Sequence, residues 1–204
     1  MKIYEKIGKR SVDVVCSLFG LLVCAPLFVI VGMLIKIYSK GPVFFIQNRV
    51  GLVGKEFQLI KFRTMYADEK AKLLMFEPGK TDRITPIGSI LRKTKIDELP
   101  QLWNVLRGDM SLVGPRPEVP KYVELFKKEY SEILKEKPGI TDFATIEFRD
   151  EEKALEKYGN PEEEYVKQVL PRKIELYKKY LMEKSLTIDM KLIFFTIWRI
   201  LKSE

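Results

Sequence analysis

The sequence contains no histidine among its 204 residues. A Ser-His-Asp triad, a Cys-His pair and a histidine-ligated zinc site are therefore excluded. Cysteine is also scarce, because only Cys16 and Cys24 occur and both lie inside an apolar run. We interpret them as inert thiols rather than as a disulfide framework. Acid–base or nucleophilic chemistry is left to carboxylates, Lys, Tyr, Ser, Thr or these two thiols.

The common nucleotide-binding signatures are missing as well. Neither a Walker A sequence nor a Rossmann glycine fingerprint is present, and no internal repeat or low-complexity tract occurs. The length suits one domain of ordinary size, and an apolar fraction of 46% is sufficient for a packed core. The chain is therefore expected to fold. It is not expected to bind phosphate through a Walker A loop or a Rossmann glycine loop.

Positive charge is concentrated at one end of the chain. The segment up to Arg63 holds ten basic and three acidic residues, which accounts for +7 of the net charge of +8. A basic excess favours nucleic acid, anionic lipid or a phosphorylated substrate as partner. Here the excess brackets the most hydrophobic stretch of the chain, which favours a membrane surface.

That hydrophobic stretch, residues 14–35, is long enough to cross a bilayer. As a straight helix its 22 residues would extend about 33 Å, against a hydrocarbon core of about 30 Å. Pro26 lies in its middle and basic residues flank both ends. Proline interrupts a helix, and the positive-inside rule assigns both ends to the cytoplasm. The residues leave two structures open, a kinked spanning helix and a re-entrant helix–break–helix.

The rest of the chain predicts a mixture of short strands and helices. Residues 43–46 and 57–62 are typical of a hairpin, because Gly51 and Gly54 lie in their connection. Thr85 and Pro86 predict an N-cap and first residue of a short helix. The last apolar helix suits either the core or the membrane interface, and we favour the interface. The predicted helices are residues 68–76, 85–92, 99–106, 118–135, 161–184 and 188–201.

Asp97-Glu98, within the sequence KIDELPQ, is the first candidate for chemistry. The simpler interpretation is helix capping, because Asp is a good N-cap and acids favour the first turn. Arg92 precedes the pair, and Arg116 follows on the stiff sequence GPRP. A carboxylate among arginines suits two tasks, holding Mg²⁺ with a nucleotide diphosphate or attacking phosphorus to form an acyl phosphate.

Other candidates are weaker by themselves. Lys61, in KFRTM, has a simpler interpretation as a solvated strand end, and Arg149 as a surface residue. The sequence PGIT at residues 138–141 indicates a turn. Asp13 follows Arg10 by one helical turn, which favours a local ion pair over catalysis.

Taken together, these motifs resemble the bacterial sugar transferase family, the small monotopic phosphoglycosyl transferases. The resemblance covers residues 4 to about 202 and is most specific in one long run. The motifs in chain order are KRxxD, the proline-broken apolar segment, PVFFxQxRxG, KFRTM, LRKTKIDELPQLWNVLRGDMSLVGPRP and KPGIT.

The resemblance implies transfer of a sugar 1-phosphate from a UDP-sugar to polyprenol (undecaprenyl) phosphate, with release of UMP. It implies that Asp97 attacks the β-phosphorus, that Glu98 is its dyad partner and that Mg²⁺ bridges Asp97 and the diphosphate. It also implies a re-entrant hairpin that turns at Ala25-Pro26, which favours that alternative. The implied phosphate-binding cations are Lys61, Arg92, Arg116 and Arg149.

The expected architecture is α+β, mostly helical with a small hairpin. Residues 1–40 would form the membrane hairpin and residues 41–204 a catalytic domain on the cytoplasmic face of the bacterial inner membrane. The expected partners are both substrates and the lipid bilayer, with a homodimer left open and nucleic acid not expected. Where many members continue PGIT with Gly-Trp-Ala-Gln, this chain has residues 142–145 as Asp-Phe-Ala-Thr, followed by an acidic stretch.

Two further hypotheses compete with the enzyme. A membrane-tethered scaffold is motivated by the charged helices between residues 118 and 184. A basic nucleic-acid-binding domain ranks last, because the charge lies beside the apolar segment and no recognisable binding motif occurs.

Overall fold

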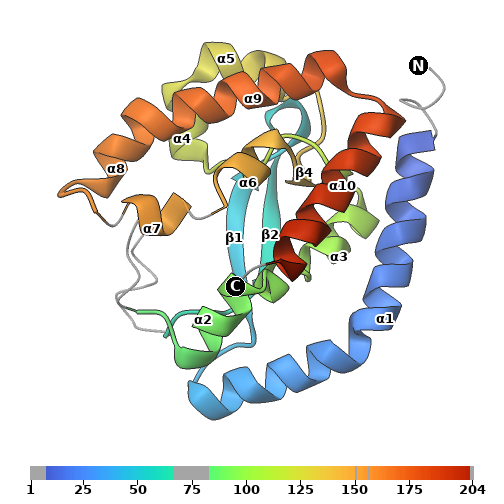
Figure 1. Cartoon of the computed structure of the whole chain (residues 1–204), viewed down its shortest axis with the longest axis vertical. Helices are drawn as coiled ribbons and strands as arrows, with labels where there is room; N and C mark the ends of the chain where they lie inside the picture. The colour runs from blue at the N-terminus through green and yellow to red at the C-terminus, as the bar shows by residue number, and fades with distance from the viewer. Residues whose placement is uncertain (1–7, 67–82, 150, 156, 203–204) are drawn as a thin grey trace.

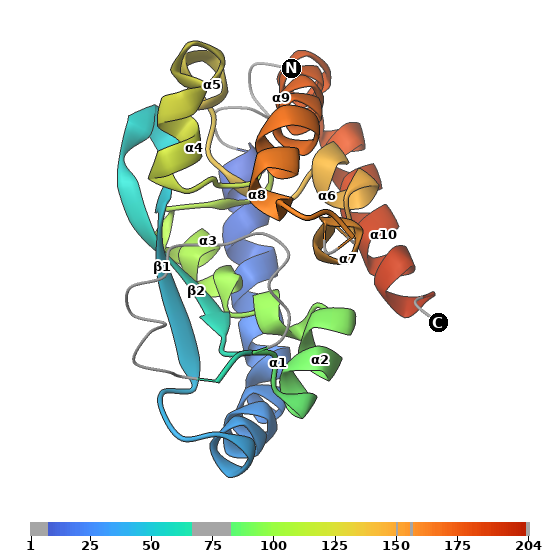
Figure 2. The same ribbon diagram turned by 90° about the vertical axis from the view of Figure 1, so that its left-hand side faces the viewer.

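The computed structural model describes residues 8–66, 83–149, 151–155 and 157–202, and the predicted helix at 68–76 lies outside them. The predicted α+β class is confirmed, because helices surround two small two-stranded sheets (Figure 1). In Figure 2 the larger sheet forms one side of the molecule and α6 (Phe143–Glu147) and α10 (Leu186–Leu201) the other, with α3 (Gln101–Arg107) between them. The main elements are α1 (Lys9–Tyr38), β1 (Phe44–Val50), β2 (Glu56–Phe62), α2 (Pro86–Lys93), η4 (Ile96–Glu98), α3 (Gln101–Arg107), β3 (Ser111–Val113), α4 (Pro120–Leu125), α5 (Lys127–Ile133), β4 (Gly139–Thr141), α6 (Phe143–Glu147), α7 (Glu151–Leu155), α8 (Pro161–Glu164), α9 (Leu170–Glu183) and α10 (Leu186–Leu201).

The apolar segment forms one bent helix. Helix α1 runs for 30 residues through Ala25-Pro26, so the structure has a bend within one helix where the sequence predicted a break between two, and the re-entrant topology stays a prediction. Figure 1 shows the helix changing direction so that its second half runs beneath the body of the protein. A proline removes one backbone hydrogen bond, and its ring clashes with the preceding turn. Both effects bend a helix at the proline. Helix α1 is the one described helix long and apolar enough to cross a membrane.

The start of α1 is tied to the body by polar contacts. Lys9 Nζ lies 2.5 Å from Asp189 Oδ2 in α10, and Arg10 donates to two carbonyls at the end of α3 at 2.6 and 2.9 Å. Asp13 Oδ1 accepts from the Ser111 hydroxyl and the Leu112 N–H. Arg10 still attracts Asp13, as expected, but both side chains face the body and make tertiary contacts as well.

The predicted hairpin is confirmed. Strands β1 and β2 pair antiparallel from Phe44 opposite Phe62 to Val50 opposite Glu56. The outer edge of β2 is covered by Asn104 of α3, whose side chain accepts from Ile60 N at 3.1 Å and donates to the carbonyl of Gln58 at 2.7 Å. This amide occupies the unpaired edge and fixes α3 against the hairpin.

The two long helices predicted over 118–135 and 161–184 are subdivided. The first is split into α4 and α5 at Phe126, which has non-helical angles of φ −119° and ψ 39°. In the second, a π-helical turn at Tyr165–Val169 joins α8 to α9. Pro171 follows within the first turn of α9, and a proline lacks the N–H that a regular helix would need there.

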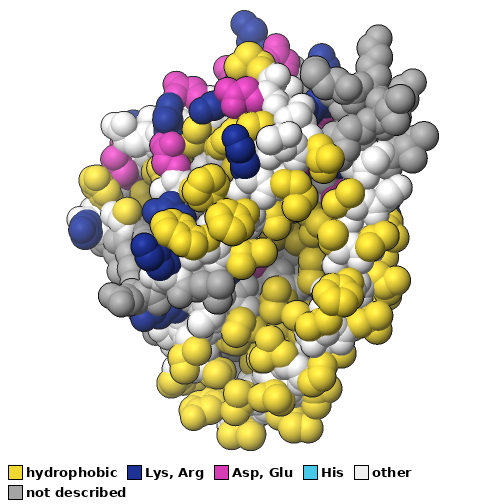
Figure 3. Space-filling view, turned by 45° about the vertical axis from the view of Figure 1, so that its right-hand side comes forward, with side chains coloured by type: hydrophobic (Ala, Val, Ile, Leu, Met, Phe, Trp, Pro, Cys, Tyr) yellow, Lys and Arg dark blue, Asp and Glu magenta, His cyan; other side chains and the backbone are white. Residues whose placement is uncertain are grey.

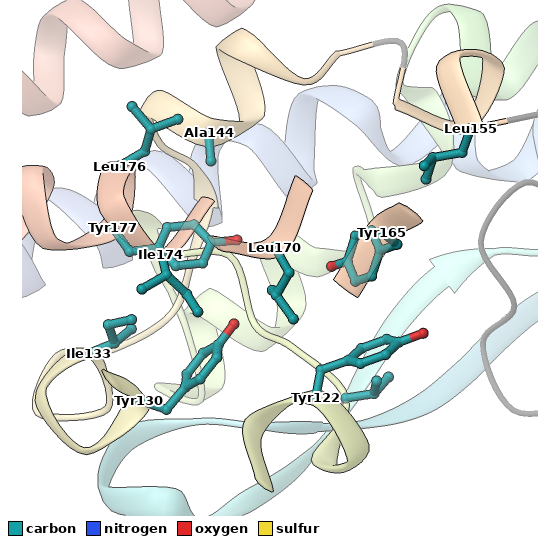
Figure 4. Close-up of a cluster of buried hydrophobic side chains, with 11 residues drawn as sticks. Tyr122, Tyr130, Ile133, Ala144, Leu155, Tyr165, Leu170, Ile174, Leu176 and Tyr177 are labelled. Carbon is teal, nitrogen blue, oxygen red and sulfur yellow. The ribbon is translucent and has the colours of Figure 1, made fainter. Parts of the chain in front are cut away.

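The largest core cluster lies beneath α9 and contains an unusual number of tyrosines. Tyr122, Tyr130, Tyr165 and Tyr177 are each at most 2% exposed and surround Leu170 (Figure 4). Their rings come from α4, α5, the π-helical turn and α9, so this cluster joins the subdivided helices. It lies away from α1, which packs through Val31 and Ile35 against a second cluster.

Candidate functional site

The Asp97-Glu98 pair occupies η4, a single 3₁₀ turn between α2 and α3. Lys95 precedes it in the left-handed region at φ 57°, which is uncommon for a residue with a side chain. Non-glycine residues in this region cluster at functional sites because the surrounding structure must hold them there. Asp97 is 7% exposed and Glu98 9%. Two adjacent carboxylates are thus withdrawn from water on a strained turn.

Glu98 is held between two cations from distant parts of the chain. Its Oε1 lies 2.8 Å from Lys61 Nζ and 2.5 Å from Arg116 Nη2, and its Oε2 lies 3.2 Å from Arg116 Nη1. Burial alone would raise the pKa of Glu98, but Arg116 and Lys61 hold that pKa well below its usual range. Glu98 therefore remains ionised and orients both cations.

Asp97 has the opposite electrostatic environment. Burial, and next the charge of Glu98, raise the pKa of Asp97 to about 6 against the attraction of Lys61, Lys95 and Arg92. Its Oδ1 is buried and has no hydrogen-bond partner within the described residues. Adjacent carboxylates whose pKa values are driven apart are typical of sites where each has a different task. Asp97 is thus the more basic carboxylate, with one oxygen available for a ligand or a reaction.

Arg92 reaches the same region from α2. Its Nε donates to the Thr64 hydroxyl at 2.9 Å, and α2 begins with the predicted cap, since Thr85 Oγ1 accepts from Gly88 N at 2.9 Å. The positive charge of Arg92 also lowers the pKa of Asp97. Thr64 belongs to KFRTM, so that motif contributes both a cation of the cluster and a partner for Arg92.

Arg149 contacts the C-terminal helix. Its guanidinium donates to the carbonyl of Arg199 in α10, and among the hydrogen bonds of the described residues none joins it to Asp97 or Glu98. Ala25 and Pro26 are exposed on α1. Direct contacts and charge interactions thus bring together Lys61, Arg92, Arg116, Asp97 and Glu98, while a phosphate-binding role of Arg149 stays a prediction.

The loop carrying Arg116 is positioned by a short parallel pairing that the sequence did not predict. Residues 138–141 were expected to be only a turn, but Gly139–Thr141 is strand β4 beside β3. Gly114 N donates to the carbonyl of Thr141 at 3.0 Å, and Gly139 N to that of Pro115 at 2.9 Å. An added Cβ on Gly139 would lie 2.1 Å from Gly114 N. Both motif glycines are required by this close approach of two backbones.

Sequence reasoning also missed Asn104 and Asp142, each of which holds part of the site. Asn104 joins α3 to β2, which carries Lys61, and the Asp142 carboxylate accepts the backbone N–H of Arg116 at 3.0 Å. Asn104 lies within the long motif that contains DELPQ, and this position in the motif was its available signal.

Among the described residues, no three His, Cys, Asp or Glu side chains are placed so that they could hold a metal ion by themselves. Mg²⁺ usually takes one or two carboxylates and completes its shell with water and substrate phosphates. Asp97 offers the unpartnered oxygen, whereas Glu98 is occupied by Lys61 and Arg116. The donor set therefore fits Mg²⁺ held by Asp97 together with a diphosphate.

Comparison with known proteins shows the family of this chain. The family described as bacterial sugar transferase matches residues 4–203. Undecaprenyl-phosphate glucose phosphotransferase of Komagataeibacter xylinus is 38% identical over 96% of this chain and 36% of the relative. UDP-glucose:undecaprenyl-phosphate glucose-1-phosphate transferases of Escherichia coli (strain K12) and Caulobacter vibrioides are 35% and 36% identical over 96% of this chain, and over 40% and 70% of their own lengths. The chain thus spans about two fifths of the length of the first two relatives. On the match over almost all of its residues, this chain belongs to the bacterial sugar transferase family.

Proposed function

We propose that this chain is a phosphoglycosyl transferase that moves a sugar 1-phosphate from a UDP-sugar to undecaprenyl phosphate and releases UMP. The observation that carries the proposal is the Asp97-Glu98 pair, in which one carboxylate has a raised pKa and one unpartnered oxygen and the other is held ionised by two cations. The names of the relatives supply the substrate class, since they are undecaprenyl-phosphate sugar phosphotransferases.

In the first step, an Asp97 oxygen attacks the β-phosphorus of the donor. A P–O bond forms to the carboxylate while the bond from that phosphorus to the bridging oxygen breaks, and UMP leaves with the bridging oxygen. The raised pKa of Asp97 makes its ionised form a better nucleophile above about pH 6. The product is a sugar phosphate esterified to Asp97.

In the second step, an oxygen of undecaprenyl phosphate attacks the same phosphorus. The acyl-phosphate P–O bond breaks, the Asp97 carboxylate is restored, and the lipid carries the sugar through a diphosphate. Lys61 and Arg116 are oriented by Glu98 and outnumber its charge, so they attract phosphate oxygens in both steps. Bound Mg²⁺ held by Asp97 would supply neutralising charge on the diphosphate.

The lipid substrate requires an enzyme at a membrane surface, and the apolar surface of the chain suits this requirement. Figure 3 shows apolar side chains covering the lower and right-hand part of one face, with charged side chains gathered at the upper left. From α1, Phe19 and Leu22 are each 67% exposed, and from α10 Phe194 is 65% exposed. We infer that α1 inserts from the cytoplasmic side of the inner membrane and that α10 lies in the interface.

A panel of UDP-sugars with undecaprenyl phosphate and Mg²⁺, scored for UMP, tests the proposed reaction. We expect UMP release with at least one sugar and loss of turnover when Mg²⁺ is omitted. Release of UDP instead would mean ordinary glycosyl transfer and a different broken bond. Absence of turnover with every sugar nucleotide would favour the membrane-tethered scaffold.

The position of α10 is tested by tryptophan quenching in vesicles that contain brominated lipids. The Trp103→Phe variant leaves Trp198 of α10 as the sole tryptophan, and we expect strong quenching of its emission. The control carries Trp103→Phe, Trp198→Phe and Tyr158→Trp, which moves the reporter to an exposed position in the acidic stretch. Equal quenching at both positions, or none at Trp198, would contradict an interfacial α10.

A further inference from the structure

Asp142 is a buried carboxylate for which the proposed mechanism has so far no use. It directly follows β4 and is fully buried. Its Oδ1 accepts from Thr145 N at 2.6 Å and thereby caps α6, while its Oδ2 accepts from Arg116 N at 3.0 Å. Burial raises the pKa of Asp142, and these two N–H groups oppose the increase. A helix cap requires only the first of the two contacts, so the second needs another explanation.

The backbone around Arg116 can donate few hydrogen bonds, because prolines lie on both sides. Pro115 and Pro117 lack an N–H, so Arg116 has the only backbone donor between Gly114 and Glu118. That donor is engaged by Asp142. The carbonyls on either side are also bound, since Pro115 accepts from Gly139 N at 2.9 Å and Pro117 from the Arg49 guanidinium at 3.0 Å.

The Arg116 side chain, in turn, makes the two-pronged contact with Glu98 beside Asp97. A fork–fork pair of this kind demands a defined position of the arginine backbone, because both N–H···O bonds must align together. The chain of contacts runs from α6 through Asp142 to Arg116 and then to Glu98.

We propose that Asp142 is a positioning residue that holds Arg116 in register with Glu98 for the phosphate transfer. This inference rests on the proposed function only for its effect on turnover, because the effect on Arg116 itself can be observed without any substrate. Asp142 touches neither Asp97 nor Glu98 in the contacts of the described residues, so it acts through Arg116.

Two substitutions separate the contact with Arg116 from the helix cap. Asp142→Ser keeps a hydroxyl that can cap α6, as Ser185 caps α10 by accepting from Ile188 N, but removes the second acceptor. Asp142→Gly removes both acceptors and, as an N-cap, glycine costs little helix stability. The matched controls are Asn160→Ser and Asn160→Gly, because Asn160 caps α8 through Glu163 N and has no contact with Arg116.

The first measurement is turnover of the full chain in lipid nanodiscs with an accepted UDP-sugar. We expect kcat to fall on the order of 10- to 100-fold in both Asp142 variants, the scale of a misplaced catalytic group. The Asn160 variants should retain the parental kcat. Parental kcat in either folded Asp142 variant would overturn the proposal.

The second measurement is NMR of protein labelled with ¹⁵N-arginine, in the absence of substrate. We expect faster exchange of the Arg116 amide and a shifted or broadened guanidinium signal in the Asp142 variants, with neither change in the Asn160 variants. Unaltered Arg116 signals would overturn the positioning role even if kcat fell. If the wild-type chain released no UMP from any donor, the proposed function would fail, and the Arg116 signals would still decide whether Asp142 holds this residue.

Discussion

Asp97→Asn is expected to abolish sugar-phosphate transfer while leaving the protein folded. The amide is close in size to the carboxylate but cannot attack phosphorus, so we expect UMP release to fall on the order of 10³-fold or more. The measurement is UMP release from an accepted UDP-sugar in the presence of undecaprenyl phosphate.

The control for this loss is Glu124→Gln. Glu124 Oε1 lies 3.0 Å from Lys127 Nζ in an exposed ion pair, outside the Asp97-Glu98 cluster. Its amide variant should keep turnover within about twofold, because an exposed pair contributes little to stability. Near-normal UMP release by Asp97→Asn would remove Asp97 as the nucleophile.

The same variant is expected to be more stable than the wild type at neutral pH. A native pKa of about 6 against an ordinary 3.8 means that the folded state favours the protonated acid. The stability associated with this proton is complete below about pH 4 and is lost as pH rises through 6. The neutral amide avoids that loss, on the order of 2–3 kcal/mol.

This gain is checked by urea unfolding in micelles containing EDTA, from pH 4 to pH 8. The advantage of Asp97→Asn should be close to zero at pH 4 and should reach its full value above pH 7. An advantage independent of pH, or a less stable variant at pH 8, would contradict the raised pKa of Asp97. Greater stability with lost activity is the usual pattern where an active site holds an unfavourable charge.

Gly139→Ala is expected to have a large structural effect on this site. The new Cβ would lie 2.1 Å from Gly114 N and 2.5 Å from Gly114 O, and both are backbone atoms that cannot rotate away. Strands β3 and β4 would have to separate, at a cost of roughly 3 kcal/mol or more. Because Arg116 follows two residues after Gly114, turnover should fall as well.

The measurement is the thermal unfolding midpoint together with UMP release, and Gly159→Ala is the control. An added Cβ on Gly159 would meet no atom within 4 Å, and its backbone does not occupy the left-handed region. The control should therefore change stability by no more than about 0.5 kcal/mol. Equal midpoints for the two alanine variants would show that the two strands can separate without cost.

Local signals in the sequence were sufficient for several elements. The Thr85 cap, the hairpin with its glycine connection and the long apolar helix are confirmed, because each depends on residues that are neighbours in the chain. The predicted break at Pro26 is a bend within one continuous helix, because a proline removes a single backbone hydrogen bond.

The grouping of site residues was only partly predictable. Motif order placed Lys61, Arg92 and Arg116 with the two carboxylates, but it did not indicate that the Arg149 guanidinium bonds to α10. A motif records which residues occur, whereas the direction of a side chain depends on the helix packed against it.

The sequence alone determined the chemical repertoire of this protein: carboxylates and arginines without histidine, beside an apolar helix suited to a bilayer. Tertiary structure decided which carboxylate is held ionised by cations and which has a raised pKa. Lys61 and Arg116, 37 and 18 residues away from Glu98, converge on that side chain and leave Asp97 buried with an unpartnered oxygen. Charge interactions depend on distance and on exclusion of water, and packing sets both only when segments remote in the chain come together.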